Sequence, residues 1–388
     1  MMKKKPLLIV LILVQICLLS GCWSKKELDE ISILSGVGID VGEEKQLRLT
    51  MQVILHREMK IESQSGKRGG EEKPTQNVVV EGNSLIDANR NYILQTGRRG
   101  YWSHINVLII GEELAKKGIS PILDVLERDQ EVRRRTYLLV AKGNAKEILD
   151  AETIDLEIIQ AFNISDMVKL SESNGKNVMV DLHRYFLRAS KNFNNAFMTG
   201  IGIIDKGCTN NLELMDTAIF NENKLVGWFD NIETRGLLWV LGEIQSCIIE
   251  VQYPLEKGLY VYIDNLRASS SIKPVIRDNT LEKLIVNIAS EGKVAESNTE
   301  VDLSKGDIIK KLEEDTAKVI EEEVYKAIEK GKELEVDIFT FDEAINRENP
   351  KLWKEIEDYW LDIFPSVPVE VNVDMTIRRT GLITKSNE

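Results

Sequence analysis

The N-terminal stretch constrains this chain more than any other, because it divides the chain into a leader and a body. Three lysines precede an apolar run from Leu7 to Leu19, which stops at Gly21 and Cys22. A basic start, a short apolar run and small residues at a cleavage point are typical of a secretory signal peptide. A membrane-spanning helix needs about 20 apolar residues, so this run is too short to span. We therefore expect residues 1–21 to be a cleaved signal peptide.

The end of the leader, Leu19-Ser20-Gly21-Cys22, resembles the cleavage box of bacterial lipoproteins. In that box the cysteine sulfur, a strong nucleophile as its thiolate, is alkylated with diacylglycerol before cleavage. Two acyl chains anchor a protein stably, whereas one holds it only marginally. We therefore predict a diacylglycerol cysteine at Cys22, with palmitate among its lipids, that tethers the body to one membrane face. The alternatives are an ordinary signal peptide with an incidental cysteine, or a leader that stays as an anchor helix.

Charge and motif content exclude several classes of function. The formal net charge is −13, and it falls to −16 when the three leader lysines are removed. This acidity argues against a nucleic-acid partner and against an electrostatic grip on anionic lipid. The three histidines are isolated, and the sequence lacks H-E-x-x-H, paired C-x-x-C, phosphate-loop and G-x-S-x-G motifs. We therefore expect no metal site, no cofactor and no catalytic site. If Cys22 carries lipid, the mature chain can form one disulfide, between Cys208 and Cys247. Cys208 lies in an expected turn and Cys247 in an expected apolar strand, so we favour free thiols.

Alternating strand and helix patterns up to about residue 195 predict an α/β domain with a mixed sheet. We expect a hairpin of strands at 31–40 and 46–55, and a capping box that starts a helix at Asn144. Another helix is expected after Asn83 or Ser84, and its apolar residues are expected on the inner side: Leu85, Ile86, Ala88, Ile93 and Leu94.

The later part of the chain has a different predicted pattern of strands and helices. The middle is predicted to be antiparallel strands, with one turn near Ser269. The remainder predicts an amphipathic helix over Asp307–Lys330, a second helix from Asn349-Pro350 to Ile363, and a closing strand. The expected fold class is α+β, with a mixed or antiparallel sheet and flanking helices in each domain. The expected boundaries are signal peptide 1–21, N-terminal α/β domain 22–195, middle domain 196–270 and C-terminal α+β domain 271–388.

Candidate contact residues fall in two places. Arg133, Arg134 and Arg135 form the sharpest basic cluster, between a helix and a strand. They suit an ion-pair network or a contact to an acidic partner, and the alternative is a solvated linker. Trp23 and Glu27 follow the cleavage point and would lie beside the membrane.

Longer segments resemble the Ger(x)C spore germination lipoproteins, the C subunits of nutrient germinant receptors. The resemblance covers nearly the whole mature chain in order, and its block TAIFNENKLVGWFDNIETRGLLWVLGE is particularly specific. The loop from Lys60 to Thr75 departs from the family pattern. The other segments are Cys22-Trp23 with Glu27-Leu28, GVGID, SHINVLIIGEELAKKGI, ERDQEVRRRTYLLVAKGNAKEIL, NPKLWKEIEDYWLDIF and VPVEVNVDMTIRRTGL.

The resemblance implies a three-domain α+β lipoprotein that is lipidated at Cys22 and has no assigned catalytic residue. It also implies integral membrane A and B receptor subunits as partners, and a location on the outer face of the cell membrane, in the spore inner membrane. The leading hypothesis is therefore a noncatalytic subunit required for germination. An extracytoplasmic lipoprotein that captures a small nutrient itself, and an extracytoplasmic hydrolase, are the alternatives.

Overall fold

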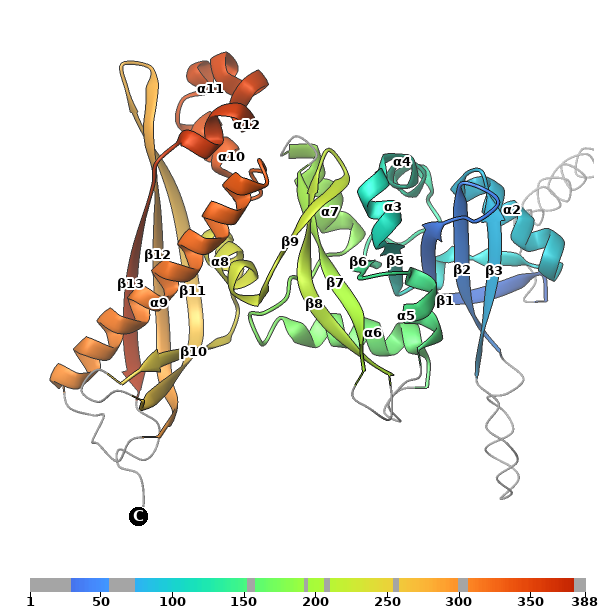
Figure 1. Cartoon of the computed structure of the whole chain (residues 1–388), viewed down its shortest axis with the longest axis horizontal. Coiled ribbons are helices and arrows are strands. Elements are labelled where there is room, and N and C mark those ends of the chain that lie inside the picture. Colours follow the sequence, from blue (N-terminus) through green and yellow to red (C-terminus); the bar gives the residue numbers. More distant parts are fainter. Residues whose placement is uncertain are drawn as a thin grey trace, which may run out of the picture.

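The structure, a computed structural model, describes residues 29–55, 74–151, 158–191, 195–205, 210–253, 258–298 and 306–379. These residues form an elongated molecule with two sheets placed one after the other along its long axis (Figure 1). Helices and strands are mixed throughout, so the expected α+β class is confirmed. The predicted sites at Gly21, Cys22, Trp23 and Glu27, and the thiol of Cys208, lie outside the described residues.

The first sheet has nine strands in the order β3-β2-β1-β5-β6-β7-β8-β9, and β4 pairs with β1 beside this path. Pairing is parallel from β1 through β5 and β6 to β7, and antiparallel toward both edges, which confirms the mixed sheet and the β1–β2 hairpin. The strand bounds are β1 Ile31–Val41, β2 Leu47–Ile54, β3 Thr75–Gly82, β4 Arg99–Tyr101, β5 Val107–Gly111, β6 Tyr137–Ala141, β7 Ala196–Asp205, β8 Asn210–Asn221 and β9 Lys224–Phe229.

Helices cover both faces of this sheet, so its central strands are apolar on both sides. Val107 and Ile109 of β5 pack with α5 and α6, whereas Leu108 and Ile110 face the larger core on the opposite side. The helix bounds are α2 Leu85–Thr96, α3 Glu112–Lys117, α4 Ser120–Arg128, α5 Ala145–Asp150, α6 Gln160–Ser171 and α7 Leu182–Lys191.

The second sheet has the order β10-β11-β12-β13, antiparallel except for the parallel pair β12–β13. The long helix α9 runs along this sheet in Figure 1. The described helices do not include one with both the length and the hydropathy to span a bilayer. The bounds are α8 Asn231–Leu241, β10 Cys247–Gln252, β11 Tyr260–Arg277, β12 Thr280–Ser297, α9 Gly306–Glu333, α10 Phe341–Glu348, α11 Pro350–Ile356, α12 Trp360–Ile363 and β13 Val369–Arg379.

Helix α8 joins the two sheets. Thr234 Oγ1 donates to Thr217 Oγ1 on β8 of the first sheet at 2.9 Å. On the other side, Glu323 of α9 accepts from Arg235 and, at 3.1 Å, from the indole of Trp239. A Cβ on Gly236 would lie 2.1 Å from the carbonyl oxygen of Glu323, so glycine lets α8 and α9 approach closely. One continuous apolar core therefore runs through both sheets.

Two expectations for the second half are wrong in detail. No turn occurs near Ser269, because Ser269 pairs with Ala289 in the middle of the β11–β12 ladder. The chain turns instead at Asp278 and Asn279, both with positive φ, as two-residue hairpin turns require. The helix expected from Pro350 to Ile363 is interrupted, since residues 357–359 form a 3₁₀ turn between α11 and α12. The boundaries near residues 195 and 270 stay predictions; β7–β9 pair into the first sheet, and β10 and β11 into the second.

The expected inner face of α2 is confirmed for Leu85 and Ala88 and wrong for Ile86, Ile93 and Leu94. The buried side chains of α2 are Leu85, Ala88 and Tyr92, whereas Ile86 and Leu94 are exposed. The helix carries two apolar stripes, and only the one with the large ring of Tyr92 faces the sheet. Its start was predicted correctly, because Ser84 Oγ accepts from the amide of Asp87.

The cap of α5 comes from a distant strand instead of from the expected capping box. Asp40 of β1 accepts from the amides of Ala145 and Lys146 at 2.7 and 3.0 Å. Nδ2 of the Asn144 side chain donates to Glu147 Oε1 at 3.0 Å, and this side chain accepts no capping bond from the helix amides. Asp40 is buried, and this burial raises its pKa.

Replacing Asp40 should therefore cost more stability than replacing Asn144. We expect D40A to lower the free energy of unfolding by about 1–3 kcal/mol, because two buried amides lose their acceptor. The matched variant N144A should lower it by less than about 0.5 kcal/mol. Urea unfolding followed by circular dichroism measures both, and equal losses would contradict the assignment of the cap to Asp40.

Candidate functional site

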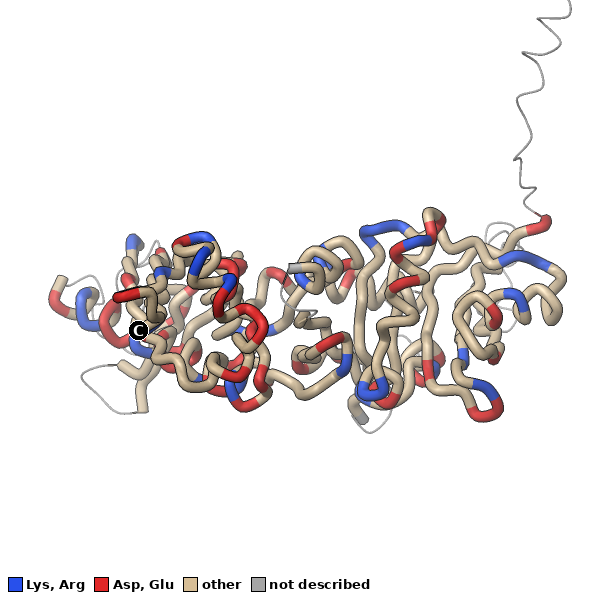
Figure 2. The backbone as a smooth tube through the Cα atoms, turned by 90° about the horizontal axis from the view of Figure 1, so that it is seen from above, with Lys and Arg blue, Asp and Glu red and all other residues tan. Residues whose placement is uncertain are grey.

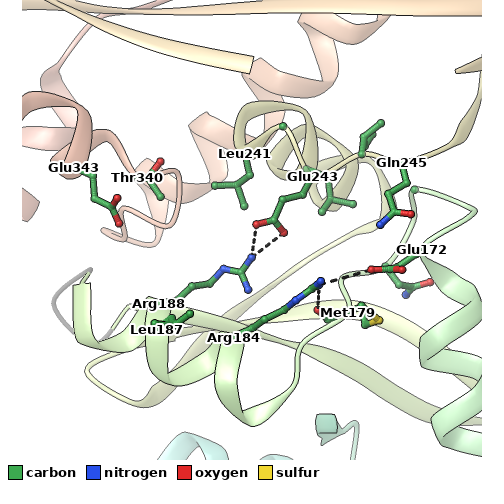
Figure 3. A pocket seen from close by; sticks show the side chains of 15 residues that line it. Glu172, Met179, Arg184, Leu187, Arg188, Leu241, Glu243, Gln245, Thr340 and Glu343 are labelled. Carbon is green, nitrogen blue, oxygen red and sulfur yellow. Dashed lines mark hydrogen bonds and ion pairs between the residues drawn. The ribbon is translucent and has the colours of Figure 1, made fainter. Parts of the chain in front are cut away.

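A cavity of about 520 Å³ lies where the first sheet meets the second half of the chain. Figure 3 shows that α7 forms one side, the C-terminal end of α8 and the following segment form the other, and Thr340 and Glu343 approach from α10 and the turn before it. Its charged lining residues are Glu172, Arg184, Arg188, Glu243 and Glu343.

Arg188 is the best-held charge in the cavity. Its Nη2 donates to both carboxylate oxygens of Glu243, at 2.6 and 2.8 Å, and its guanidinium lies 4.3 Å from the ring centroid of Phe197. An arginine held by a carboxylate and an aromatic face is fixed in position. Its Nη1 is buried and has no hydrogen-bond partner among the described residues. This ion pair links α7 to the segment after α8.

Arg184, one turn earlier on α7, is also engaged. Its Nη1 donates to the carbonyl oxygen of Met179 at 3.0 Å and lies 3.7 Å from the carboxylate of Glu172. The two arginines that point into the cavity in Figure 3 therefore both interact with other residues that line the cavity. Any polar ligand would have to compete with these contacts.

The turn that carries Thr340 is built around a buried carboxylate. Asp337 accepts from the amides of Phe339, Phe341 and Asp342 and from the indole of Trp360, at 2.9 to 3.4 Å. This set of bonds holds Thr340 in the left-handed region, with φ 65°, a conformation that non-glycine residues seldom adopt.

Burial raises the pKa of both carboxyl groups in this turn, Asp337 and Asp342. Burial and the neighbouring Asp337 raise the pKa of Asp342 to about 8. Its Oδ1 is buried without a hydrogen-bond partner among the described residues. A carboxyl group in such a setting is protonated near neutral pH.

The chemistry of the cavity is that of paired charges. Its lining offers arginines and carboxylates that neutralise each other. Such a lining can hold two parts of a chain together, or it can bind a small polar molecule that displaces one of the paired groups. The part of the chain that the structure describes contains no cluster of three or more His, Cys, Asp or Glu placed to hold a metal ion. The Cys247 thiol is free and buried, and burial raises its pKa to about 12, which disfavours the reactive thiolate.

The predicted basic cluster is placed elsewhere, after α4. Arg134 donates to the carbonyl oxygen of Glu127 at 3.0 Å and its guanidinium lies 5.0 Å from the ring centroid of Phe186. Within the described ranges, none of Arg133, Arg134 and Arg135 forms an ion pair, so the expected ion-pair network is not found there. The side chains of Arg133 and Arg135 are exposed. A contact of these two with an acidic partner stays a prediction.

Sequence reasoning did not find the Arg188–Glu243 pair, because 55 positions separate the two residues. The one local signal is the strong alternation of apolar and basic residues in LHRYFLRASK, which is helix α7. That pattern marks an amphipathic helix but names no partner for its arginines.

Comparison with known proteins assigns the family. The description "Spore germination protein N-terminal domain" matches residues 24–203, and "Spore germination B3/ GerAC like, C-terminal" matches residues 215–381. The chain belongs to the Ger(x)C family. The family expected from the sequence is thereby confirmed. The second match begins within β8, so it includes β9 and α8 together with the second sheet.

Full-length relatives of this Ger(x)C protein are spore germination proteins. Spore germination protein KC of Bacillus subtilis is 27% identical over 399 residues, covering 98% of this chain and 97% of the relative. Spore germination protein B3 of the same organism is 25% identical, covering 95% and 96%. The crystal structure of the GerBC protein has the same fold, with a TM-score of 0.58 and 20% identity over 88% of this chain and 96% of that chain.

The buried carboxyl group of Asp342 should make stability depend on pH. Between about pH 4 and 8 the unfolded chain releases this proton while the folded chain keeps it, so the free energy of unfolding should fall as pH rises. We expect D342N to remove the contribution of Asp342 to this decrease in the free energy of unfolding. The variant should be more stable than the original protein at pH 8 by about 1.4 kcal/mol or more, the value of one pKa unit.

The measurement is urea unfolding from pH 4.5 to 8.5, with D362N as the matched control at a carboxyl group outside this turn. A D342N variant whose pH dependence matches that of the original protein would show that Asp342 titrates normally.

Proposed function

We propose that this Ger(x)C protein is a lipid-anchored, noncatalytic subunit of a spore nutrient germinant receptor. It is attached through Cys22 to the outer face of the spore inner membrane and acts with integral membrane A and B subunits of the same receptor. The observation that carries the proposal is the family match over both halves of the chain, joined to the lipoprotein cleavage box at Leu19–Cys22.

The proposed anchor has a mechanical consequence for assembly. A body tied to a bilayer meets its membrane partners in two dimensions, and this confinement raises their effective concentration. Contacts of modest affinity are then enough to keep the receptor together. The lipid is needed because the body is strongly acidic, and net negative charge repels an anionic membrane surface.

A second function, direct capture of a small nutrient, is supported by one observation, the cavity between α7 and α8. Its arginines could hold a carboxylate group such as that of an amino acid. Against this function, Nη2 of Arg188 already donates to both oxygens of Glu243. A ligand would have to displace this ion pair or reach Nη1, which is buried.

Replacing Cys22 tests the anchor. We expect C22A to leave a folded body that no longer partitions with membranes, since the lipid is the attachment. C208A, which removes a different thiol, should stay in the membrane fraction as the original protein does. Membrane fractionation followed by mass spectrometry of the N-terminal peptide measures both results. Normal membrane retention of C22A would rule out the tether.

Calorimetric titration of the purified C22A body with amino acids and sugars separates the two functions. The subunit function predicts no saturable heat and no rise in melting temperature. Direct capture predicts both, because a ligand at 100 times its Kd stabilises the folded state by about 2.7 kcal/mol. In that case R188Q should remove the heat, whereas the surface variant R128Q should keep it.

A further inference from the structure

The outward face of α2 carries large aliphatic side chains where a solvent-facing helix normally carries polar ones. Ile86, Arg90 and Leu94 follow one another at intervals of four residues, and Ile93 lies beside them, on the side opposite the buried Leu85, Ala88 and Tyr92. Leu94 is 85% exposed and Ile86 is 52% exposed. An apolar stripe with arginine on a surface helix is the pattern of helices that lie at a membrane interface.

This face lies at the end of the molecule where the described chain begins (Figure 1). Helix α2 ends at Gly97, and strand β4 follows it with Arg99 paired to Ile31 of β1. The amide of Arg99 donates to the carbonyl oxygen of Glu30 at 2.9 Å. The C-terminal end of α2 is therefore fixed next to the first described residues.

The length of chain up to Cys22 limits how far this end can be from the membrane. Glu30 comes eight positions after Cys22 in the sequence, and a fully extended chain spans at most about 3.6 Å per residue. A lipid on Cys22 thus keeps the end of the body that carries α2 within about 29 Å of the bilayer. The inference rests on the lipid anchor proposed above.

The outward face of α2 and the residues just after it carry arginines, although the chain as a whole is acidic. Arg90, Arg98 and Arg99 are exposed, and none of them pairs with a carboxylate among the residues that the structure describes. Asp87, on the flank of α2, accepts from the amide of Asn83 at 2.9 Å and lies 4.0 Å from Lys45. Figure 2 shows both blue and red segments at this end of the molecule. The first two described residues, Asp29 and Glu30, are exposed carboxylates.

Arginine and aliphatic side chains on one face match the two layers of a lipid surface. The aliphatic groups suit the boundary between headgroups and acyl chains, and guanidinium groups donate hydrogen bonds to the phosphates. Long arginine stems can lie along apolar surface while their charged ends reach the headgroups.

We propose that the outward face of α2, with Ile86, Ile93 and Leu94 flanked by Arg90 and Arg98, docks on the lipid surface that holds Cys22. The body then has two attachments, one covalent lipid and one helix face. Two attachments fix which end of the body meets the membrane, so that the second sheet is presented at a defined place to membrane partners.

The test uses the lipidated full-length protein reconstituted in vesicles of phosphatidylglycerol and phosphatidylethanolamine. A fluorophore that is sensitive to polarity is attached to L94C in a C208S background, and lipids brominated on the acyl chain act as the quencher. Cys247 is buried with its pKa raised to about 12, so it does not compete for the label. The matched control is L266C, since Leu266 is 49% exposed on β11 of the other sheet.

We expect quenching at position 94 to be at least twofold stronger than at position 266. We expect R90E/R98E to reduce the quenching at position 94 by twofold or more, while the protein stays with the vesicles. Equal quenching at positions 94 and 266 on protein that floats with the vesicles would overturn the docking of α2 and leave the anchor intact. Protein that fails to float would instead count against the anchor and the proposed function.

Discussion

The contact between α8 and α9 is the constraint on which the rest of the molecule depends. Gly236 lets the two helices approach until a Cβ would clash with the carbonyl oxygen of Glu323. In that contact the buried carboxylate of Glu323 is paired by Arg235 and the indole of Trp239. A buried charge is tolerated only with such partners. Because Thr234 also ties α8 to β8, the same short helix holds a sheet on each side.

The position of α8 gives a structural reason why its sequence block is a particularly specific part of the family resemblance. The segment from Thr217 to Glu243 contains the end of β8, strand β9 and all of α8. It also supplies Glu243, which holds Arg188 in the cavity. A change in this segment affects both sheets and the cavity between them. We infer that the segment is specific because it joins the two halves, with no catalytic role required of it.

The membrane proposals require a body that is acidic overall to meet a bilayer at one end. The whole chain is acidic, and this acidity favours a lipid anchor over an electrostatic one. The end next to the anchor nevertheless exposes arginines and aliphatic side chains on α2. Salt screens the repulsion from distant acidic groups beyond a Debye length of about 8 Å, whereas groups at the interface act at contact. A globally acidic body can therefore meet the bilayer at one end.

The features that depend on near neighbours could be predicted from the amino-acid sequence alone. The alternation of apolar and polar residues predicts the β1–β2 hairpin, and the 3.6-residue period of apolar residues predicts α9. The capping side chain of Ser84 predicts the start of α2. Each of these patterns involves residues only a few positions apart. The family also followed from the sequence, since ordered segments along most of the chain carry it.

Long-range packing determines which of the two apolar stripes on α2 is buried and which carboxylate caps α5. Both stripes of α2 are apolar, and Tyr92 faces the sheet because β2 and β3 lie on that side. Asp40 caps α5 from 105 positions away, and Glu243 meets Arg188 across the cavity from 55 positions away. Such contacts follow from how the sheets place distant segments side by side, and the local sequence of each partner does not contain that information.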